Sequence, residues 1–163
     1  MTALALGAAL VLGAPAAVVR RAPAFSFGGI GGAKSLASLR GQAVVLLVAA
    51  TGKTKALRKQ IKNLQPHFHD LSSRGTVFVA AFADGSGTVP SNIPFVIAAN
   101  GAAVAAAYGM KEDFAIAIIG PDGNLDLRSD APVPGGRVLE VIKNTFEVQE
   151  KGRREIPKGP PGR

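Results

Sequence analysis

The chain has 163 residues, of which 47% are hydrophobic and 18% charged, and its formal net charge is +8. One domain of this length buries enough apolar surface to fold without a disulfide or a structural metal. Cysteine is absent from the whole sequence, which excludes disulfides, thiol catalysis and cysteine-ligated metals.

The first 21 residues predict a secretory signal peptide or a weak membrane anchor. Residues 3–19 carry no charge and consist mostly of Ala, Leu, Val and Gly. The triplet APA at 14–16 matches the small-x-small pattern of a signal-peptidase site, so we expect cleavage after Ala16 or Ala17. Two arginines follow the apolar run, whereas a signal normally carries its cations before it. We expect an exported protein, periplasmic or extracellular; an uncleaved membrane anchor, or a segment that packs within the fold, stays open as an alternative.

The next segment is rich in Gly and Pro and leads into a buried strand. Residues 24–27 predict a short edge strand, followed by a flexible glycine-rich stretch at 28–32. Ser35 is expected to cap one helical turn through Leu39. The continuous apolar run AVVLLVAA at 43–50 predicts a strand buried on both faces, as in the middle of a parallel sheet.

A long amphipathic helix is predicted from Lys53 to about Ser73. Its apolar residues recur every three or four positions and form one stripe: Leu57, Ile61, Leu64, Phe68 and Leu71. Pro66 lacks an amide donor and is expected to kink the helix, and Gly75 suits a left-handed cap beyond its end. The run TVFVAAFA at 76–83 predicts a second buried strand, so that strand, helix and strand form a right-handed crossover.

The second half predicts smaller elements and an antiparallel hairpin. After a loop at 84–92 come a short strand at 94–98, an Asn-Gly turn and a helix at 102–108. The strand at 114–119, the turn GPDGN and the strand at 125–128 form the hairpin. A last helix is predicted from Arg137 to about Gln149, and the charged, Pro- and Gly-rich tail after it is expected to be disordered.

This order of elements resembles the thioredoxin-like arrangement over about residues 24–149. VVLLVAAT at 44–51 resembles the strand that enters a thioredoxin or peroxiredoxin active site, and AVAAAYGM followed by FAIAIIGPDGNLDL resembles a peroxiredoxin stretch. More narrowly, the segments 60–79, 106–134 and 138–155 resemble an uncharacterised bacterial domain family related to domains in extracellular sushi-repeat proteins.

The resemblance implies an α/β, three-layer thioredoxin-like fold, with a central mixed sheet built from a βαβ unit followed by a ββα unit. The domain then spans 22–149, between the leader at 1–21 and a basic tail at 150–163. Lys53 and Ala56 occupy the positions of the two redox cysteines of those families, and Phe114 occupies the position of their cis-proline. A thiolate nucleophile requires sulfur, so we expect a non-catalytic domain that works by binding, without disulfide reductase or peroxidase activity.

The start of the long helix is a candidate site for a small anion, formed by Gly52, Lys53, Thr54 and Lys55. The alternative is that Thr51 or Thr54 simply caps the helix. A phosphate loop is excluded because the glycine it requires is replaced by Leu47, inside the strand. As a further alternative, a desolvated Lys53 is the centre of a repurposed enzyme, because burial depresses the pKa of a lysine.

Charge is unevenly distributed, which predicts either a basic face that attracts an acidic partner or a solvated surface that only keeps the protein soluble. Residues 41–69 contain five cations and no acid, whereas residues 111–130 contain five acids and two cations. A basic face attracts an acidic protein or an anionic surface. One tyrosine and no tryptophan leave few stacking platforms, so no specific nucleic acid is expected. His67 and His69 point apart on a helix, and the hairpin acids lack calcium-loop spacing, so neither a metal nor a cofactor is predicted.

Overall fold

The computed structural model describes residues 20–29, 31–85, 87–89 and 91–155. The predicted leader up to residue 19, with its cleavage site, and the last part of the predicted tail from residue 156 lie outside the described residues. Among the described residues, no helix combines the length and the apolar character that crossing a membrane requires.

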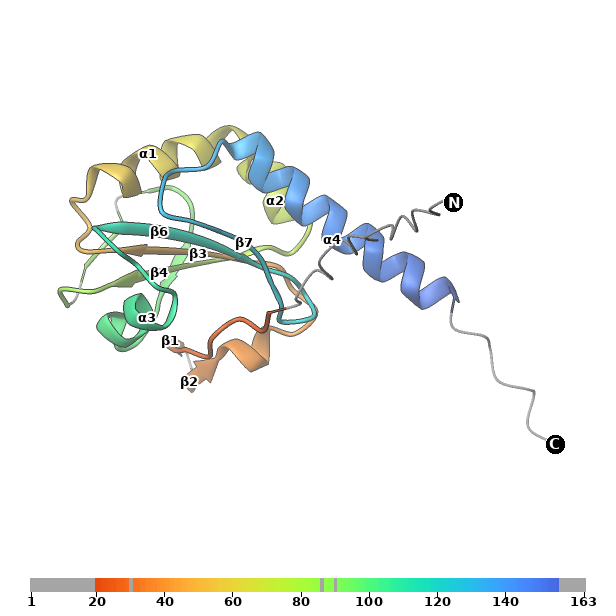
Figure 1. Cartoon of the computed structure of the whole chain (residues 1–163), viewed down its shortest axis with the longest axis horizontal. Helices are drawn as coiled ribbons and strands as arrows, with labels where there is room; N and C mark the ends of the chain where they lie inside the picture. Colours follow the sequence, from red (N-terminus) through yellow and green to blue (C-terminus); the bar gives the residue numbers. More distant parts are fainter. Residues whose placement is uncertain (1–19, 30, 86, 90, 156–163) are drawn as a thin grey trace, which may run out of the picture.

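The centre of the molecule is a mixed sheet of five strands in the order β5-β4-β3-β6-β7 (Figure 1). The strands are β3 (Val44–Ala49), β4 (Val77–Phe82), β5 (Phe95–Ile97), β6 (Phe114–Ile119) and β7 (Leu125–Ser129). The β3, β4 and β5 strands run parallel, and β6 and β7 form the antiparallel hairpin. The predicted buried strands and the hairpin are therefore confirmed.

Helices cover both faces of this sheet and make three layers (Figure 1). On one face lie α1 (Lys55–Leu64), α2 (Phe68–Ser73) and α4 (Gly135–Glu155). On the other face lie α3 (Gly101–Ala107) and a two-stranded sheet of β1 (Ser26–Gly29) and β2 (Gly32–Ser35). The short 3-10 helix η1 (Leu36–Leu39) follows β2, where one helical turn was predicted, but the Ser35 side chain makes no capping hydrogen bond. The βαβ unit followed by a ββα unit is thus present.

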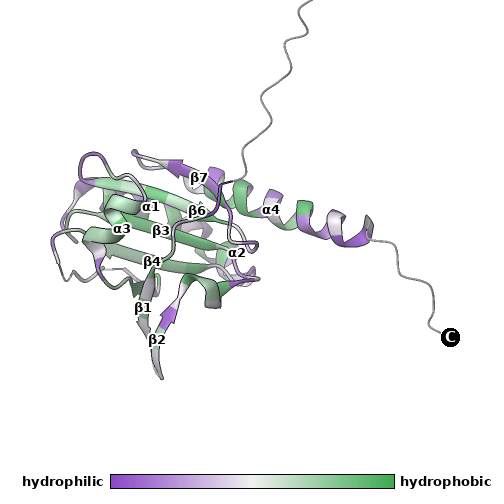
Figure 2. Ribbon diagram, turned by 60° about the horizontal axis from the view of Figure 1, so that its bottom comes forward, coloured by the Kyte–Doolittle hydropathy of each residue, from purple (hydrophilic) through white to green (hydrophobic). Residues whose placement is uncertain are grey.

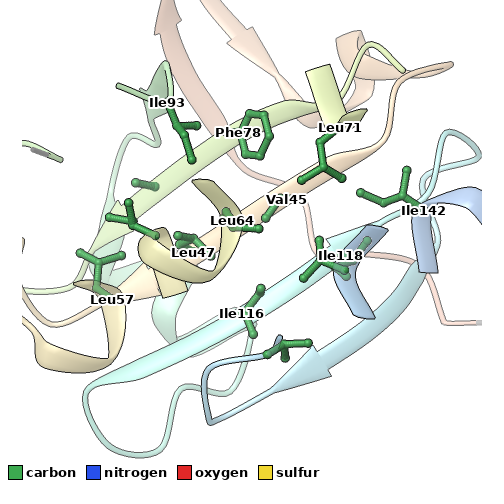
Figure 3. Packing of buried hydrophobic residues seen from close by; sticks show 14 of the residues in the cluster. Val45, Leu47, Leu57, Leu64, Leu71, Phe78, Ile93, Ile116, Ile118 and Ile142 are labelled. Atoms are coloured by element: carbon green, nitrogen blue, oxygen red, sulfur yellow. The ribbon is translucent and has the colours of Figure 1, made fainter. Parts of the chain in front are cut away.

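The long helix is interrupted where Pro66 predicted a kink. The 3-10 helix η2 (Gln65–His67) separates α1 from α2, and Gly75 adopts φ +69° beyond α2. The apolar stripe packs on the sheet: Leu57, Leu64 and Leu71 are fully buried beside strand residues such as Val45 and Leu47 (Figure 3). Alternate strand residues, among them Leu46, point to the opposite face and form a second apolar cluster. The central strands β3, β4 and β6 are accordingly coloured as hydrophobic in Figure 2.

The glycine-rich segment forms a hairpin, which corrects two predictions. The predicted edge strand at 24–27 lies at 26–29, and it pairs with β2, in the stretch expected to be flexible. Gly31 and Gly32 have φ +98° and +114°, a conformation that glycine adopts without steric cost, and so the chain reverses tightly there. Ala99 N–H donates to the Ser26 carbonyl at 2.8 Å, which attaches the hairpin to the end of β5.

The sequence predicted that the domain begins at Ala22, and main-chain contacts with the domain already begin at Arg20. The Arg20 carbonyl accepts a hydrogen bond from the Leu125 amide at 2.8 Å, and Arg21 forms an isolated bridge with Asn124. These contacts fix the chain on the start of β7. Arg20 and Arg21 therefore contact the folded domain through their main chain.

The last helix is longer than predicted and corrects the start of the tail. The α4 helix continues to Glu155, so residues 150–155 are helical and the prediction of disorder from 150 is wrong there. Glu150 and Arg154 form an i,i+4 ion pair at 3.0 Å, and Lys, Arg and Glu have high helix propensity. The end of α4 projects beyond the sheet (Figure 1).

Tyr108 provides a test of the packing beneath the sheet. It is the only tyrosine, it is buried, and its hydroxyl donates to the Pro23 carbonyl at 2.7 Å. Burial raises the pKa of its phenol above the usual value of about 10. Above that pH the folded state holds a proton that the unfolded chain releases, so the free energy of unfolding falls as pH rises.

We therefore expect the near-ultraviolet absorbance of phenolate to appear only together with loss of the helical circular dichroism signal. A Tyr108→Phe variant lacks this alkaline contribution and serves as the control for lysine deprotonation. Phenolate formation near the usual pKa in a protein with intact circular dichroism would contradict the buried position.

Candidate functional site

Two threonines form hydrogen bonds within the connection between β3 and α1. The Thr51 hydroxyl oxygen accepts from the Lys53 amide at 3.2 Å, and the Thr54 hydroxyl oxygen accepts from the Thr51 amide at 3.3 Å. Thr54 occupies the N-cap position of α1, but its hydroxyl makes no capping hydrogen bond to the first helical turn. The threonines thus stabilise the turn before the helix, and the predicted side-chain cap is wrong in this respect.

Two neighbouring loops form hydrogen bonds with this turn at the edge of the sheet where β3 and β4 end. The Ala50 amide donates to the Asp113 carbonyl at 2.9 Å, and the Asp84 amide donates to the Ala50 carbonyl at 3.0 Å. A Cβ atom on Gly52 would lie 2.7 Å from the Thr88 carbonyl oxygen, which only glycine avoids. The turn is therefore packed tightly against the loop that follows β4.

The four candidate anion-site residues lie together in this turn. Thr54 is 8% exposed, whereas Lys53 and Lys55 are exposed to solvent. None of the cavities described below is lined by Gly52 or by its three successors. The anion site at the helix start stays a prediction.

The helix begins two residues later than predicted, which changes the surroundings of Lys53. The first residue of α1 is Lys55, so Lys53 precedes the N-cap and its side chain is in water. The repurposed-enzyme alternative requires a desolvated lysine, and the exposure of Lys53 does not provide one. Ala56 lies in the first turn of α1, Phe114 is buried, and no peptide bond is cis among the residues that the structure describes.

The exposed side of α1 presents a basic face, formed by Lys55, Arg58, Lys59 and Lys62. The ion pairs of the described part of the chain join Arg to Asp or Glu elsewhere, on β7 and α4, and none includes a residue of the basic face. A shallow cavity of about 220 Å³ lies on this face and is lined by Arg58, Ile61, Lys62 and Gln65. The four cations are three or four residues apart along α1, so they lie on one side of the helix.

The acids of the hairpin are engaged in local contacts. Asp122 accepts hydrogen bonds from Asn124 within the turn, and Asp126 accepts from the Thr145 hydroxyl at 2.8 Å. Burial raises the pKa of Asp126, the Thr145 hydrogen bond opposes this, and the charge of Asp122 adds to it. The hydrogen bond from Arg128 lowers the pKa of Asp130. Within the described ranges, no three His, Asp or Glu side chains converge as metal ligands would.

Sequence reasoning missed a second basic cluster beneath the sheet. Arg20, Lys111 and Arg128 line one cavity of about 340 Å³ between the end of α3 and the start of β7. These residues are far apart along the chain and follow no motif. Only the pairing of residue 20 with the start of β7 could have indicated that they meet.

Comparisons with known proteins support the architecture. No protein-family model and no curated protein matches this sequence. A thiol:disulfide interchange protein of the thioredoxin family from Chlorobium tepidum shares 19% identity over 80% of this chain and 99% of its own, with a TM-score of 0.60. The thioredoxin domain of a thiol-disulfide oxidoreductase from Bacteroides vulgatus shares 16% sequence identity over 79% of this chain and 94% of its own, with a TM-score of 0.56.

A protein named as a peroxidase is similar in fold as well. Thioredoxin peroxidase I from Plasmodium yoelii shares 15% identity over 86% of this chain and 95% of its own, with a TM-score of 0.60. Identities this low show a common fold and leave the chemistry to the residues themselves. The chain has a thioredoxin-like fold and contains no cysteine.

Proposed function

We propose that this protein is an exported, non-catalytic thioredoxin-like domain that binds an acidic protein partner through the basic face of α1. Because the chain has no cysteine, it has no thiol for the disulfide exchange or peroxidase reactions after which its structural neighbours are named. The export component rests on the apolar N-terminal sequence alone. The narrower resemblance to an uncharacterised bacterial domain family is part of this proposal.

The charge arrangement on α1 is the observation that carries the proposal. Lys55 and Lys59 are four residues apart, as are Arg58 and Lys62, so like charges face each other along the helix. Each such pair destabilises a helix by about 0.2–0.5 kcal/mol. Lys55 also lies at the positive end of the helix dipole, where a cation is unfavourable. Folding alone gives no reason for this arrangement, but a partner that supplies carboxylates relieves the repulsion.

The cavity on the basic face favours a protein partner over a simple anion. Ile61 is 5% exposed and contributes to the lining between Arg58 and Lys62. A cavity lined by an apolar residue and two cations suits a partner segment that presents an apolar side chain beside acidic ones. This combination gives orientation as well as attraction.

The test uses poly-L-glutamate as the probe and the charge-reversed variant Arg58→Glu/Lys62→Glu. We expect the wild-type chain to bind at low salt, with binding that weakens as salt screens the charges. We expect the variant to bind at least about tenfold more weakly, because two favourable contacts become repulsive. Its melting temperature is expected to be unchanged or higher, because the two new glutamates repel each other only as Arg58 and Lys62 did, and each gains an i,i+3 pair with Lys55 or Lys59.

The matched control is Lys34→Glu/Arg153→Glu, which makes the same change in net charge at two exposed positions away from α1. Binding by this control is expected to remain close to that of the wild type. Equal losses in both variants would mean that only net charge matters, and the proposed surface would then be wrong. Absence of any binding at low salt would also contradict it.

A further inference from the structure

A cavity beneath the sheet has the features of a small-molecule site and is independent of the basic face of α1. Its lining residues come from the end of α3, from β7 and from the chain before β1. The α3 helix lies on the face of the sheet opposite α1 (Figure 1). The volume of the cavity is about 340 Å³. This value is near the lower end of the range of about 300–1,000 Å³ that is usual for ligand pockets.

Arg128 is held rigidly at this cavity. Its Nε donates to the Tyr108 carbonyl at 2.9 Å, and its Nη2 donates to the Gly109 carbonyl and to Asp130 Oδ1, the latter at 2.6 Å. A guanidinium has five N–H donors, and the two on Nη1 have no acceptor among the described residues. A fixed guanidinium with unused donors is preorganised for an anion, since little side-chain freedom is lost on binding.

Two further cations border the same cavity. The main chain of Arg20 is fixed by the hydrogen bond from the Leu125 amide, so its side chain starts from a defined position. Lys111 lies two residues beyond Gly109, and it also lines the cavity. No acid is among the lining residues, and Asp130, which pairs with Arg128, offsets one of the three cations. The site therefore has a local charge of about +2.

The rest of the lining is compact and mostly apolar. Pro23, Ala106, Ala107 and Leu125 contribute to it. The Tyr108 hydroxyl is already used, because it donates to the Pro23 carbonyl. The pocket thus combines cations with short apolar residues in a small volume, which suits a small ligand and not a polymer.

From these observations we infer that this cavity binds a small dianionic molecule, carrying a phosphate group or two carboxylates. The recognition elements are the free Nη1 donors of Arg128 and the charges of Arg20 and Lys111. The site is separate from the carboxyl end of β3, where the resemblance to redox families would place a reactive centre. It also does not depend on the proposed function of α1.

The experiment titrates the full chain with glycerol 3-phosphate and with succinate, followed by amide chemical shifts in NMR spectra. We expect saturable shifts at Gly109, Lys111 and Leu125 with at least one of these probes, and none with uncharged glycerol. The variant Arg20→Gln/Lys111→Gln changes two exposed side chains and spares Arg128, whose loss would disturb α3. Its binding is expected to be weaker by at least about tenfold.

The control variant Lys55→Gln/Lys59→Gln removes two charges from the basic face of α1 and is expected to bind the probes as the wild type does. Retained binding in Arg20→Gln/Lys111→Gln would overturn the inference. Shifts confined to residues 53–62, or no saturable shift with either probe, would overturn it equally. Because the poly-L-glutamate test concerns the opposite face, the two proposals fail or succeed separately.

Discussion

Replacing Gly135 with alanine is expected to lower the free energy of unfolding by about 2–3 kcal/mol, because the new methyl group overlaps a neighbouring helix. A Cβ atom at this position would lie 1.9 Å from the Asn63 carbonyl oxygen and 2.5 Å from the His67 ring. The close approach of α4 to the end of α1 depends on the absence of that atom. Urea denaturation monitored by circular dichroism measures the loss.

The adjacent residue provides an internal control with the opposite sign. A Cβ atom on Gly136 would meet nothing within 4 Å, and the residue lies in the first turn of α4. Alanine is expected to stabilise the protein there by about 0.5–1 kcal/mol, through lower backbone entropy in the unfolded chain and higher helix propensity. Equal effects of the two substitutions would show that α1 and α4 do not pack as described.

The second large effect is expected at Gln60, whose side chain is fully buried. Its Nε2 donates to the Val133 carbonyl at 2.9 Å, and its Oε1 accepts from the Val133 amide at 2.6 Å. The side chain thus pairs with the main chain as a second strand would. It ties α1 to the segment that leads into α4, and so it holds the basic face in place on the sheet.

A Gln60→Glu substitution keeps the acceptor, loses the donor and buries a charge at neutral pH. We expect a loss of at least about 3 kcal/mol in the free energy of unfolding at pH 7. Burial raises the pKa of the new carboxyl above its unfolded value of about 4.3, so the folded state binds the extra proton. The destabilisation therefore grows as pH rises above that value and is relieved as pH falls, when the protonated acid donates again.

Denaturation curves for this variant and the wild type at several pH values test this expectation. Gln65→Glu is the matched control, since it introduces the same charge at an exposed position five residues further along the chain. Its effect is expected to stay within about 0.5 kcal/mol at every pH. A pH-independent loss in Gln60→Glu would show that the acid does not occupy the buried amide position.

Much of the fold was predictable because its signals are local. The strands β3, β4 and β6 are buried on both faces, so their sequences are continuous apolar runs. The α1 and α2 helices present one stripe to the sheet, and Pro66 and Gly75 act through their own backbones. These features need no knowledge of distant residues.

The features that were missed depend on contacts between distant residues. The hairpin of β1 and β2 contains four glycines and little apolar pattern, and its attachment to β5 comes from a main-chain hydrogen bond. Pairing of Arg20 with the start of β7 likewise uses main-chain groups, which every sequence has. The polar residue Gln60 falls within the buried part of α1, and its partner Val133 is 73 residues away.

By itself, the sequence determined that thiol chemistry is impossible, that a mixed sheet is covered by helices, and that α1 is basic. Composition is sufficient for the first and the last of these conclusions, whereas the mixed sheet covered by helices is what the resemblance to thioredoxin-like proteins implied. Only the tertiary structure decided that Lys53 lies in water before the helix, and that Arg20, Lys111 and Arg128 meet at one cavity. The physical reason is that a site is defined by distances in space, and strand order and main-chain pairing set those distances for residues that no sequence pattern connects.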